Sequence, residues 1–189
     1  MIGEHFGHVF DKPLGRLARH IPVSPNVLTV TGFLVTVCAS VLLVSNVRLG
    51  GLLLVVGGIF DILDGIVARV QGRATLFGAF LDSYLDRYAD GFLLVGLAAG
   101  FFRTGNIQGV LLCLSSLIGA FMVSYARARA EGLGIDCKVG VMERPERLAV
   151  LAFGTVSGIL TPSLWVLSLL SHFTALQRLR RVWRAAAEG

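Results

Sequence analysis

The stretch FDILDGIVARVQGRATLFGAFLDSYLDR, from Phe60 to Arg87, is the most informative part of the sequence about the fold and the candidate site. It places four aspartates in sequence that is otherwise strongly apolar. Asp61 and Asp64 are three residues apart, so they share one face of a helix. Asp82 and Asp86 are four residues apart and share one face of the next helix. The short polar segment VQGRATLFG between the pairs predicts two antiparallel helices that bring all four carboxylates into one cluster.

The composition is typical of a membrane protein. Of the 189 residues, 54% are hydrophobic and 15% are charged, whereas soluble domains carry about 25% charged residues. The mean hydropathy is +0.75. Apolar segments of about 20 residues predict membrane spans, and we find six, at 26–45, 50–70, 77–101, 107–128, 147–161 and 163–179. We expect an all-α integral membrane protein whose six transmembrane helices form one domain over residues 23–189.

The first 25 residues lack the apolar core of a signal peptide. The segment HFGHVFDKPLGRLARHI, which begins at His5, repeats apolar residues at helical spacing beside basic ones. This pattern predicts an amphipathic helix lying on the membrane surface over residues 1–22. The alternative is a basic N-terminal tail without a fixed structure.

Basic residues are distributed unequally between the two sides of the predicted bundle. The loops on one side contain only Arg48 and Arg103, and the other lysines and arginines lie on the side of the two termini. The positive-inside rule therefore predicts that both termini and the aspartates face the cytoplasm. The excess positive charge, +5 for the chain, then lies on the surface that faces anionic lipid headgroups. We find no nucleic-acid-binding motif and expect no nucleic-acid partner.

Four clustered carboxylates repel one another unless cations are present. An all-oxygen set of ligands suits a hard divalent ion, either Mg²⁺ or Mn²⁺. The alternative is ion pairing with Arg69 and Arg87, but two arginines cannot neutralise four aspartates. Asp90, one turn later, is expected either to pair with Arg87 or to lie at the edge of the site. We expect the small residues Gly57 and Gly58 to allow close helix packing.

The pattern Asp61-x-x-Asp64-Gly65-x-x-Ala68-Arg69, eight residues, Gly78-x-x-x-Asp82-x-x-x-Asp86 resembles the full signature of the CDP-alcohol phosphotransferases. The resemblance extends over nearly the whole chain. It implies that the pyrophosphate of a CDP-linked lipid binds to two metal ions, that an alcohol attacks the lipid-side phosphorus, and that CMP leaves. It also implies that the first three aspartates are metal ligands, that Asp86 is the general base and a further ligand, and that the enzyme is a homodimer.

The resemblance also assigns the residues around the nucleotide. Within the signature region they are Gly65, Ala68, Arg69, Thr75 and Gly78. At the start of the first span they are Ser24, Pro25 and Asn26. The alternative for these last three is that they only form the helix start, with Ser24 or Asn26 as the cap.

The acceptor alcohol is indicated by arginines outside the signature. Arg127, Arg147 and Arg178 lie at the inner ends of three predicted helices, and arginine suits a phosphate monoester. The segments SYARARAEG and ERPERL resemble the phosphatidylinositol-phosphate and archaetidylinositol-phosphate synthase branch, whose acceptor is inositol 1-phosphate. In that branch Ser124, Arg127, Arg147 and Arg178 would bind the acceptor phosphate, and Arg144 would support them. Some members have lysine at the position of Arg127, which puts the geometry of that contact in doubt.

Several alternatives stay open from the sequence. The donor is CDP-diacylglycerol or CDP-archaeol, because the lipid tails leave no signal that we can identify. A phosphatidylglycerophosphate synthase, with glycerol 3-phosphate as the acceptor, would share the signature. A cation channel or transporter could also use membrane aspartates, but a basic loop beside them disfavours cation conduction.

Overall fold

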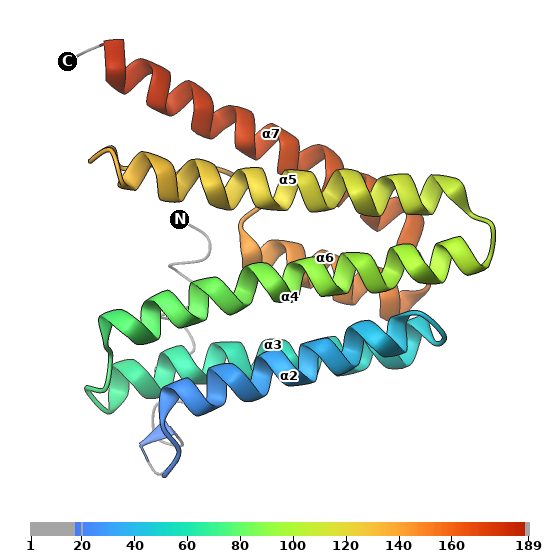
Figure 1. Ribbon diagram of the computed structural model, residues 1–189, viewed down its shortest axis with the longest axis horizontal. Helices are drawn as coiled ribbons and strands as arrows, with labels where there is room; N and C mark the ends of the chain where they lie inside the picture. The colour runs from blue at the N-terminus through green and yellow to red at the C-terminus, as the bar shows by residue number, and fades with distance from the viewer. Residues whose placement is uncertain (1–17, 20, 188–189) are drawn as a thin grey trace.

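A computed structural model describes residues 18–19 and 21–187, which form six helices and no strand (Figure 1). The helices are α2 (Pro25–Leu43), α3 (Val47–Val70), α4 (Leu76–Arg103), α5 (Ile107–Glu131), α6 (Arg144–Ser157) and α7 (Leu160–Ala187). Each of the six predicted apolar segments coincides with one helix. The all-α prediction is therefore confirmed for the described part of the chain, whereas most of the predicted surface helix over residues 1–22 lies outside it.

The helices form two groups joined by the short helix α6. Helix α2 packs against α3 and α4, and α5 packs against both α4 and α7. Helix α6 contacts α3 and α7 and so connects the two groups (Figure 1). The start of α2, the end of α3, the start of α4 and the ends of α5 and α7 all lie toward one end of the molecule. We call it the aspartate end, because the four signature aspartates lie near it.

Three of the helices are long and apolar enough to cross a membrane, namely α2, α3 and α5. The other three are less apolar or shorter. Helix α4 contains Asp82, Asp86, Arg87 and Asp90 within its apolar sequence. Helix α6 has only 14 residues and ends at Gly158, whose φ of 84° is the left-handed conformation that glycine adopts easily.

Small residues allow the helices of the first group to approach closely. A side chain at Gly57 of α3 would begin 2.5 Å from the Thr36 hydroxyl of α2, so glycine is required for this contact. The expectation of close packing is confirmed for Gly57 and wrong for Gly58, because no atom of the described residues lies within 4 Å of a Cβ placed at Gly58. The main apolar core includes Leu43, Leu93 and Leu164, all nearly inaccessible to solvent.

The connection between α3 and α4 reverses the chain within a few residues. Gly72 adopts a φ of 64° at this turn, a conformation that glycine tolerates without strain. The side chain of Gln71 donates hydrogen bonds to the backbone oxygens of Ala18 (2.8 Å) and Ile21 (2.9 Å). The turn thus returns the chain toward the aspartates of α3 and fixes the segment that leads into α2.

Candidate active site

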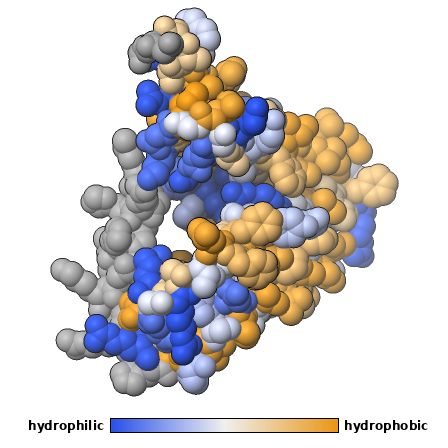
Figure 2. Space-filling model, turned by 60° about the vertical axis from the view of Figure 1, so that its left-hand side comes forward, coloured by the Kyte–Doolittle hydropathy of each residue, from blue (hydrophilic) through white to orange (hydrophobic). Residues whose placement is uncertain are grey.

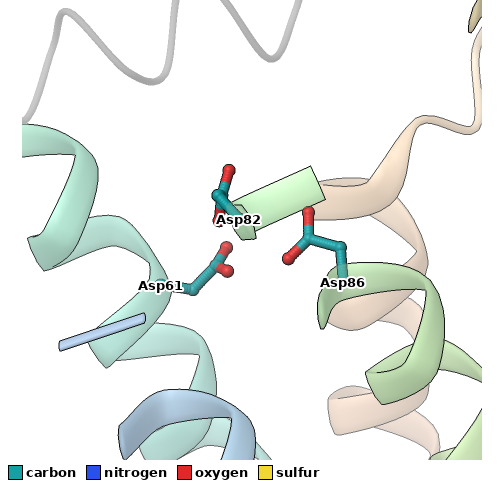
Figure 3. A group of neighbouring side chains, drawn as sticks. All are labelled: Asp61, Asp82 and Asp86. Carbon is teal, nitrogen blue, oxygen red and sulfur yellow. The ribbon is translucent and has the colours of Figure 1, made fainter. Parts of the chain in front are cut away.

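Three of the four signature aspartates form a carboxylate cluster. Asp61 on α3 and Asp82 and Asp86 on α4 point toward one another (Figure 3). Each offers one oxygen, and these oxygens all lie within 4.8 Å of one another. Asp61 and Asp82 are partly buried, and Asp86 is buried. Oxygen ligands at this separation, converging from two helices, suit one or more hard divalent cations.

Asp64 lies beside the carboxylate cluster rather than within it. Its position one turn after Asp61 directs it toward a neighbouring pocket, which it lines together with Asp82. The residue is only 5% exposed, and its Oδ2 has no hydrogen-bond partner among the described residues. A buried carboxylate oxygen without a donor is costly unless a cation balances it. The four aspartates therefore fit a metal site, with Asp64 on one flank.

We call the pocket beside Asp64 the glycine pocket. It is open at the aspartate end and is bounded by the start of α2, the end of α3 and the start of α4. Its lining includes Pro25, Asn26, Asp64, Gly65, Ala68, Arg69, Thr75, Gly78 and Asp82. Seven of the eight residues predicted around the nucleotide thus line one pocket, and Ser24 does not.

Glycine at two of these positions keeps the pocket open. A side chain at Gly78 would begin 3.0 Å from both Asn26 Oδ1 and Thr75 Oγ1. A side chain at Gly65 would begin 3.2 Å from a terminal nitrogen of Arg69. Larger residues at either position would therefore occupy the space between the polar groups of this pocket.

Three of the predicted residues, Ser24, Pro25 and Thr75, lie at helix ends. The Thr75 hydroxyl accepts a hydrogen bond from the Gly78 N–H (3.0 Å) and so caps α4. Ser24 occupies the cap position of α2, but its side chain makes no capping bond. Pro25 begins α2, where the missing N–H of proline costs nothing. A capping role for the Ser24 side chain is therefore not observed.

A second pocket, the arginine pocket, lies on the other side of Asp82 between α4, α5, α6 and α7. Figure 2, turned so that this end comes forward, shows hydrophilic residues around a hollow and hydrophobic residues along the flank. The lining includes Asp82, Asp86, Arg87, Ser124, Arg127, Glu131, Glu143, Arg144, Arg147 and Arg178. All four residues predicted to bind the acceptor phosphate are among them.

Two of these arginines are held by partners outside the carboxylate cluster. Arg147 is 3% exposed and places Nη2 2.6 Å from Asp90 Oδ2, while Nη1 donates to the Met142 carbonyl. Asp90 thus contacts Arg147, a residue of the arginine pocket, and lies 3.8 Å from Arg144 Nε, which agrees with its expected position at the edge of the site.

Arg178 is 2% exposed and connects α7 to α5 and to the 132–143 loop. It donates to the backbone oxygens of Val123 (2.6 Å) and Val139 (2.9 Å) and to Glu143 Oε1 (3.0 Å). Each terminal nitrogen of a guanidinium carries two hydrogens, so a phosphate contact is compatible with these bonds. Glu143, which the sequence interpretation did not single out, also lies 3.7 Å from Arg127.

Arg144 lies closer to the aspartates than its predicted supporting role implied. Its Nη1 lies 2.6 Å from Asp61 Oδ2 and its Nη2 lies 3.0 Å from Asp86 Oδ1. Its Nε lies 3.8 Å from Asp90 Oδ1. Burial opposes its charge, but the neighbouring carboxylates raise the pKa of the Arg144 guanidinium above its usual value. Arg144 therefore contacts two carboxylates of the cluster, and Arg87, named in the ion-pairing alternative, lies 3.4 Å from Asp86.

Comparison with known proteins gives one consistent family. The family model described as CDP-alcohol phosphatidyltransferase matches residues 22–179. The archaetidylinositol phosphate synthase of Methanothermobacter thermautotrophicus is 42% identical over 186 residues, covering 95% of this chain and 93% of that protein.

Solved structures of a bacterial enzyme have the same fold. The crystal structure of the Mycobacterium tuberculosis phosphatidylinositol phosphate synthase with CDP-DAG bound matches with a TM-score of 0.82 and 31% identity, covering 92% of this chain and 93% of that one. The structure of the same enzyme in complex with manganese and citrate matches with a TM-score of 0.81 and 31% identity, covering 92% and 88%.

Proposed function

Because the chain belongs to the CDP-alcohol phosphatidyltransferase family, we propose that it transfers a phosphatidyl or archaetidyl group from a CDP-lipid to inositol 1-phosphate and releases CMP. The observation that carries this proposal is the position of the carboxylate cluster between two pockets. Asp82 lines both the glycine pocket and the arginine pocket. A donor phosphate in the first and an acceptor hydroxyl in the second would therefore meet at the aspartates.

The aspartates divide into ligands and a base. Asp61, Asp64 and Asp82 hold Mg²⁺ or Mn²⁺, two ions by resemblance to the family, and Asp86 is both a ligand and the general base. The ions supply charge neutralisation at the phosphates and at the leaving group. The acceptor oxygen forms a bond to the lipid-side phosphorus, and the bond from that phosphorus to the bridging oxygen breaks. CMP leaves with the bridging oxygen, and the hydroxyl proton moves to Asp86.

The glycine pocket binds the CDP portion of the donor. Gly65 and Gly78 leave space for the ligand against the backbone, and Arg69 binds a pyrophosphate oxygen, because a guanidinium matches phosphate geometry. Pro25, Asn26, Ala68 and Thr75 line the remaining wall. Ser24 is the weakest member of this set, because it does not line the pocket.

The arginine pocket binds the phosphate of the acceptor through Ser124, Arg127, Arg147 and Arg178. Five arginines line this pocket together with four acidic residues. A dianionic phosphate monoester is better matched to such a wall than free inositol would be. The relatives named as inositol phosphate synthases support the same acceptor.

The finer architecture belongs to the same proposal. All six helices cross the membrane in the 23–189 domain, residues 1–22 form a surface helix, and two copies form a homodimer by resemblance to the family. Both termini and the aspartate end face the cytoplasm of the cell membrane. The basic residues at the aspartate end, such as Arg73, Arg129 and Arg181, support this orientation.

The test is CMP release by the purified protein in detergent with Mg²⁺ and a CDP-lipid. Parallel reactions contain inositol 1-phosphate, free inositol or glycerol 3-phosphate, each with and without EDTA. We expect EDTA-sensitive release with inositol 1-phosphate alone, with CDP-diacylglycerol and CDP-archaeol compared as donors. Release only with glycerol 3-phosphate would identify a phosphatidylglycerophosphate synthase and refute the acceptor assignment.

A further inference from the structure

Arg144 differs from Arg147 and Arg178 in the groups that hold its side chain. Its two terminal nitrogens contact Asp61 and Asp86, which are proposed metal ligands. Arg147 and Arg178 are instead held by Asp90, Glu143 and backbone oxygens. A change at the carboxylate cluster therefore acts directly on Arg144 and leaves the partners of the other two arginines in place.

A divalent cation and the Arg144 guanidinium require the same carboxylates. A cation bound by Asp61 and Asp86 would lie within a few ångströms of the Arg144 charge, and like charges at that distance repel. The side chain of Arg144 is only 16% exposed, so water screens this repulsion weakly. Cation binding consequently weakens the contacts of Arg144 with the cluster.

The arginine pocket offers another place for the charge of Arg144. Arg144 is the first residue of α6, so its side chain can rotate without moving the helix. It lines the arginine pocket together with Ser124, Arg127, Arg147 and Arg178. An acceptor phosphate bound there would be an anion within the same pocket. A guanidinium that leaves two carboxylates can then form charge-assisted hydrogen bonds to that phosphate.

We propose that Arg144 moves from Asp61 and Asp86 to the acceptor phosphate when divalent cations bind, and so couples the two sites. Cation binding makes Arg144 available to the acceptor, and the acceptor in turn removes a competitor from the carboxylates. Such coupling is reciprocal by thermodynamic necessity. The identity of the acceptor rests on the proposed function, whereas the competition between Arg144 and the cation does not.

The test is equilibrium binding of Mn²⁺ to the full-length protein in detergent, measured by calorimetry or by the electron paramagnetic resonance of free Mn²⁺. No CDP-lipid is present, so no turnover occurs. We expect inositol 1-phosphate to lower the Mn²⁺ Kd of the unmodified protein about tenfold, within the usual range of coupling between sites. Arg144→Gln should bind Mn²⁺ more tightly than the unmodified protein without the phosphate, and most of the effect of the phosphate should disappear.

Arg127→Gln is the matched control. It removes the same charge from the same pocket, but Arg127 contacts Glu131 and Glu143 rather than the aspartates. Its Mn²⁺ Kd without the phosphate should equal that of the unmodified protein. An Arg144→Gln protein whose Mn²⁺ affinity is unchanged or weaker, or whose response to inositol 1-phosphate is as large as before, would overturn the proposal.

Thermal unfolding gives a second measurement for a variant that folds poorly. Arg144→Lys keeps a charge but cannot bridge two carboxylates with a planar fork. Its Tm should fall in EDTA and recover in Mn²⁺, and an equal fall in both would overturn the proposal. Failure of the proposed function is separable, because it would appear as absent CMP release with inositol 1-phosphate while the higher Mn²⁺ affinity of Arg144→Gln persists.

Discussion

The two pockets beside the aspartates are built in different ways. The glycine pocket is formed by residues from Pro25 to Asp82, which belong to three consecutive helices. The arginine pocket draws its residues from α4, α5, α6 and α7, between Ala79 and Arg178. The first is therefore specified by local spacing and by one turn, whereas the second depends on how four helices pack.

The two walls also differ in chemistry. The glycine pocket is open because Gly65 and Gly78 have no side chain to fill it. The arginine pocket is filled with charged groups that bond one another, as Arg147 does with Asp90. We therefore expect substitutions in the first pocket to act on the donor and substitutions in the second to act on the acceptor.

Asp86→Asn should have the largest effect, because Asp86 belongs to the carboxylate cluster and is the proposed general base. Loss of a general base lowers turnover by about 100-fold to 10,000-fold, and the size of the side chain is preserved. CDP-lipid binding should stay close to normal, since Asp86 does not line the glycine pocket. Measurement of kcat together with equilibrium CDP-lipid binding checks both expectations. Substantial remaining activity would show that Asp86 is not the base.

Arg69→Ala should act on the donor side alone. A hydrogen bond to a charged group contributes about 1.5–3 kcal/mol, so the KM for the CDP-lipid should rise about tenfold to 100-fold. The KM for inositol 1-phosphate should change little. Arg69→Lys is the control, because it keeps the charge and loses the planar fork. A parallel rise of both KM values would contradict the separation of the two pockets.

The sequence alone could predict the glycine pocket well. The spacing of Asp61, Asp82 and Asp86 and the short turn at Gly72 determine which side chains meet, and seven of eight predicted residues line the pocket. Asp64 departs from the single predicted cluster because its place on the helix directs it to the pocket wall. Ser24 departs because the residues after it, not Ser24 itself, reach the pocket.

The arginine pocket could be predicted only in outline. Positive charge at helix ends indicated which arginines gather there, but charge spacing does not say which carboxylate each one contacts. The contacts of Arg144 with Asp61 and of Arg147 with Asp90 join residues 83 and 57 positions apart. Both depend on how α6 packs beside α3 and α4. The ERPERL segment indicated that Arg144 belongs near the site. No local sequence pattern, however, predicted its contacts with Asp61 and Asp86.

Asp90→Asn tests whether Asp90 positions Arg147 for binding the acceptor phosphate. Asp90 fixes Arg147 at 2.6 Å, and asparagine keeps the shape while removing the charge. We expect the KM for inositol 1-phosphate to rise about threefold to tenfold, since a neutral partner forms a bond weaker by about 1 kcal/mol. The values of kcat and of the CDP-lipid KM should stay nearly constant, which a general loss of structure would not produce.

Arg147→Ala provides the comparison for Asp90→Asn. It should raise the acceptor KM more than Asp90→Asn does, because it removes the phosphate contact itself. In the double variant the two effects should not add, since the residues are in direct contact. Additive effects, or an unchanged acceptor KM in Arg147→Ala, would remove this pair from the acceptor site.

Thr75→Ala should have the smallest effect and should show whether Thr75 does more than cap α4. Loss of the cap costs about 1 kcal/mol, which lowers the Tm by about 2–4 °C in a chain of this size. Asn106→Ala is the matched control, because Asn106 caps α5 through Gly109 at the opposite end of the molecule. Both variants should lose similar stability, but only Thr75→Ala should also raise the CDP-lipid KM. Equal KM values in the two variants would reduce Thr75 to a helix cap and leave nucleotide binding to Asn26, Arg69 and the glycines.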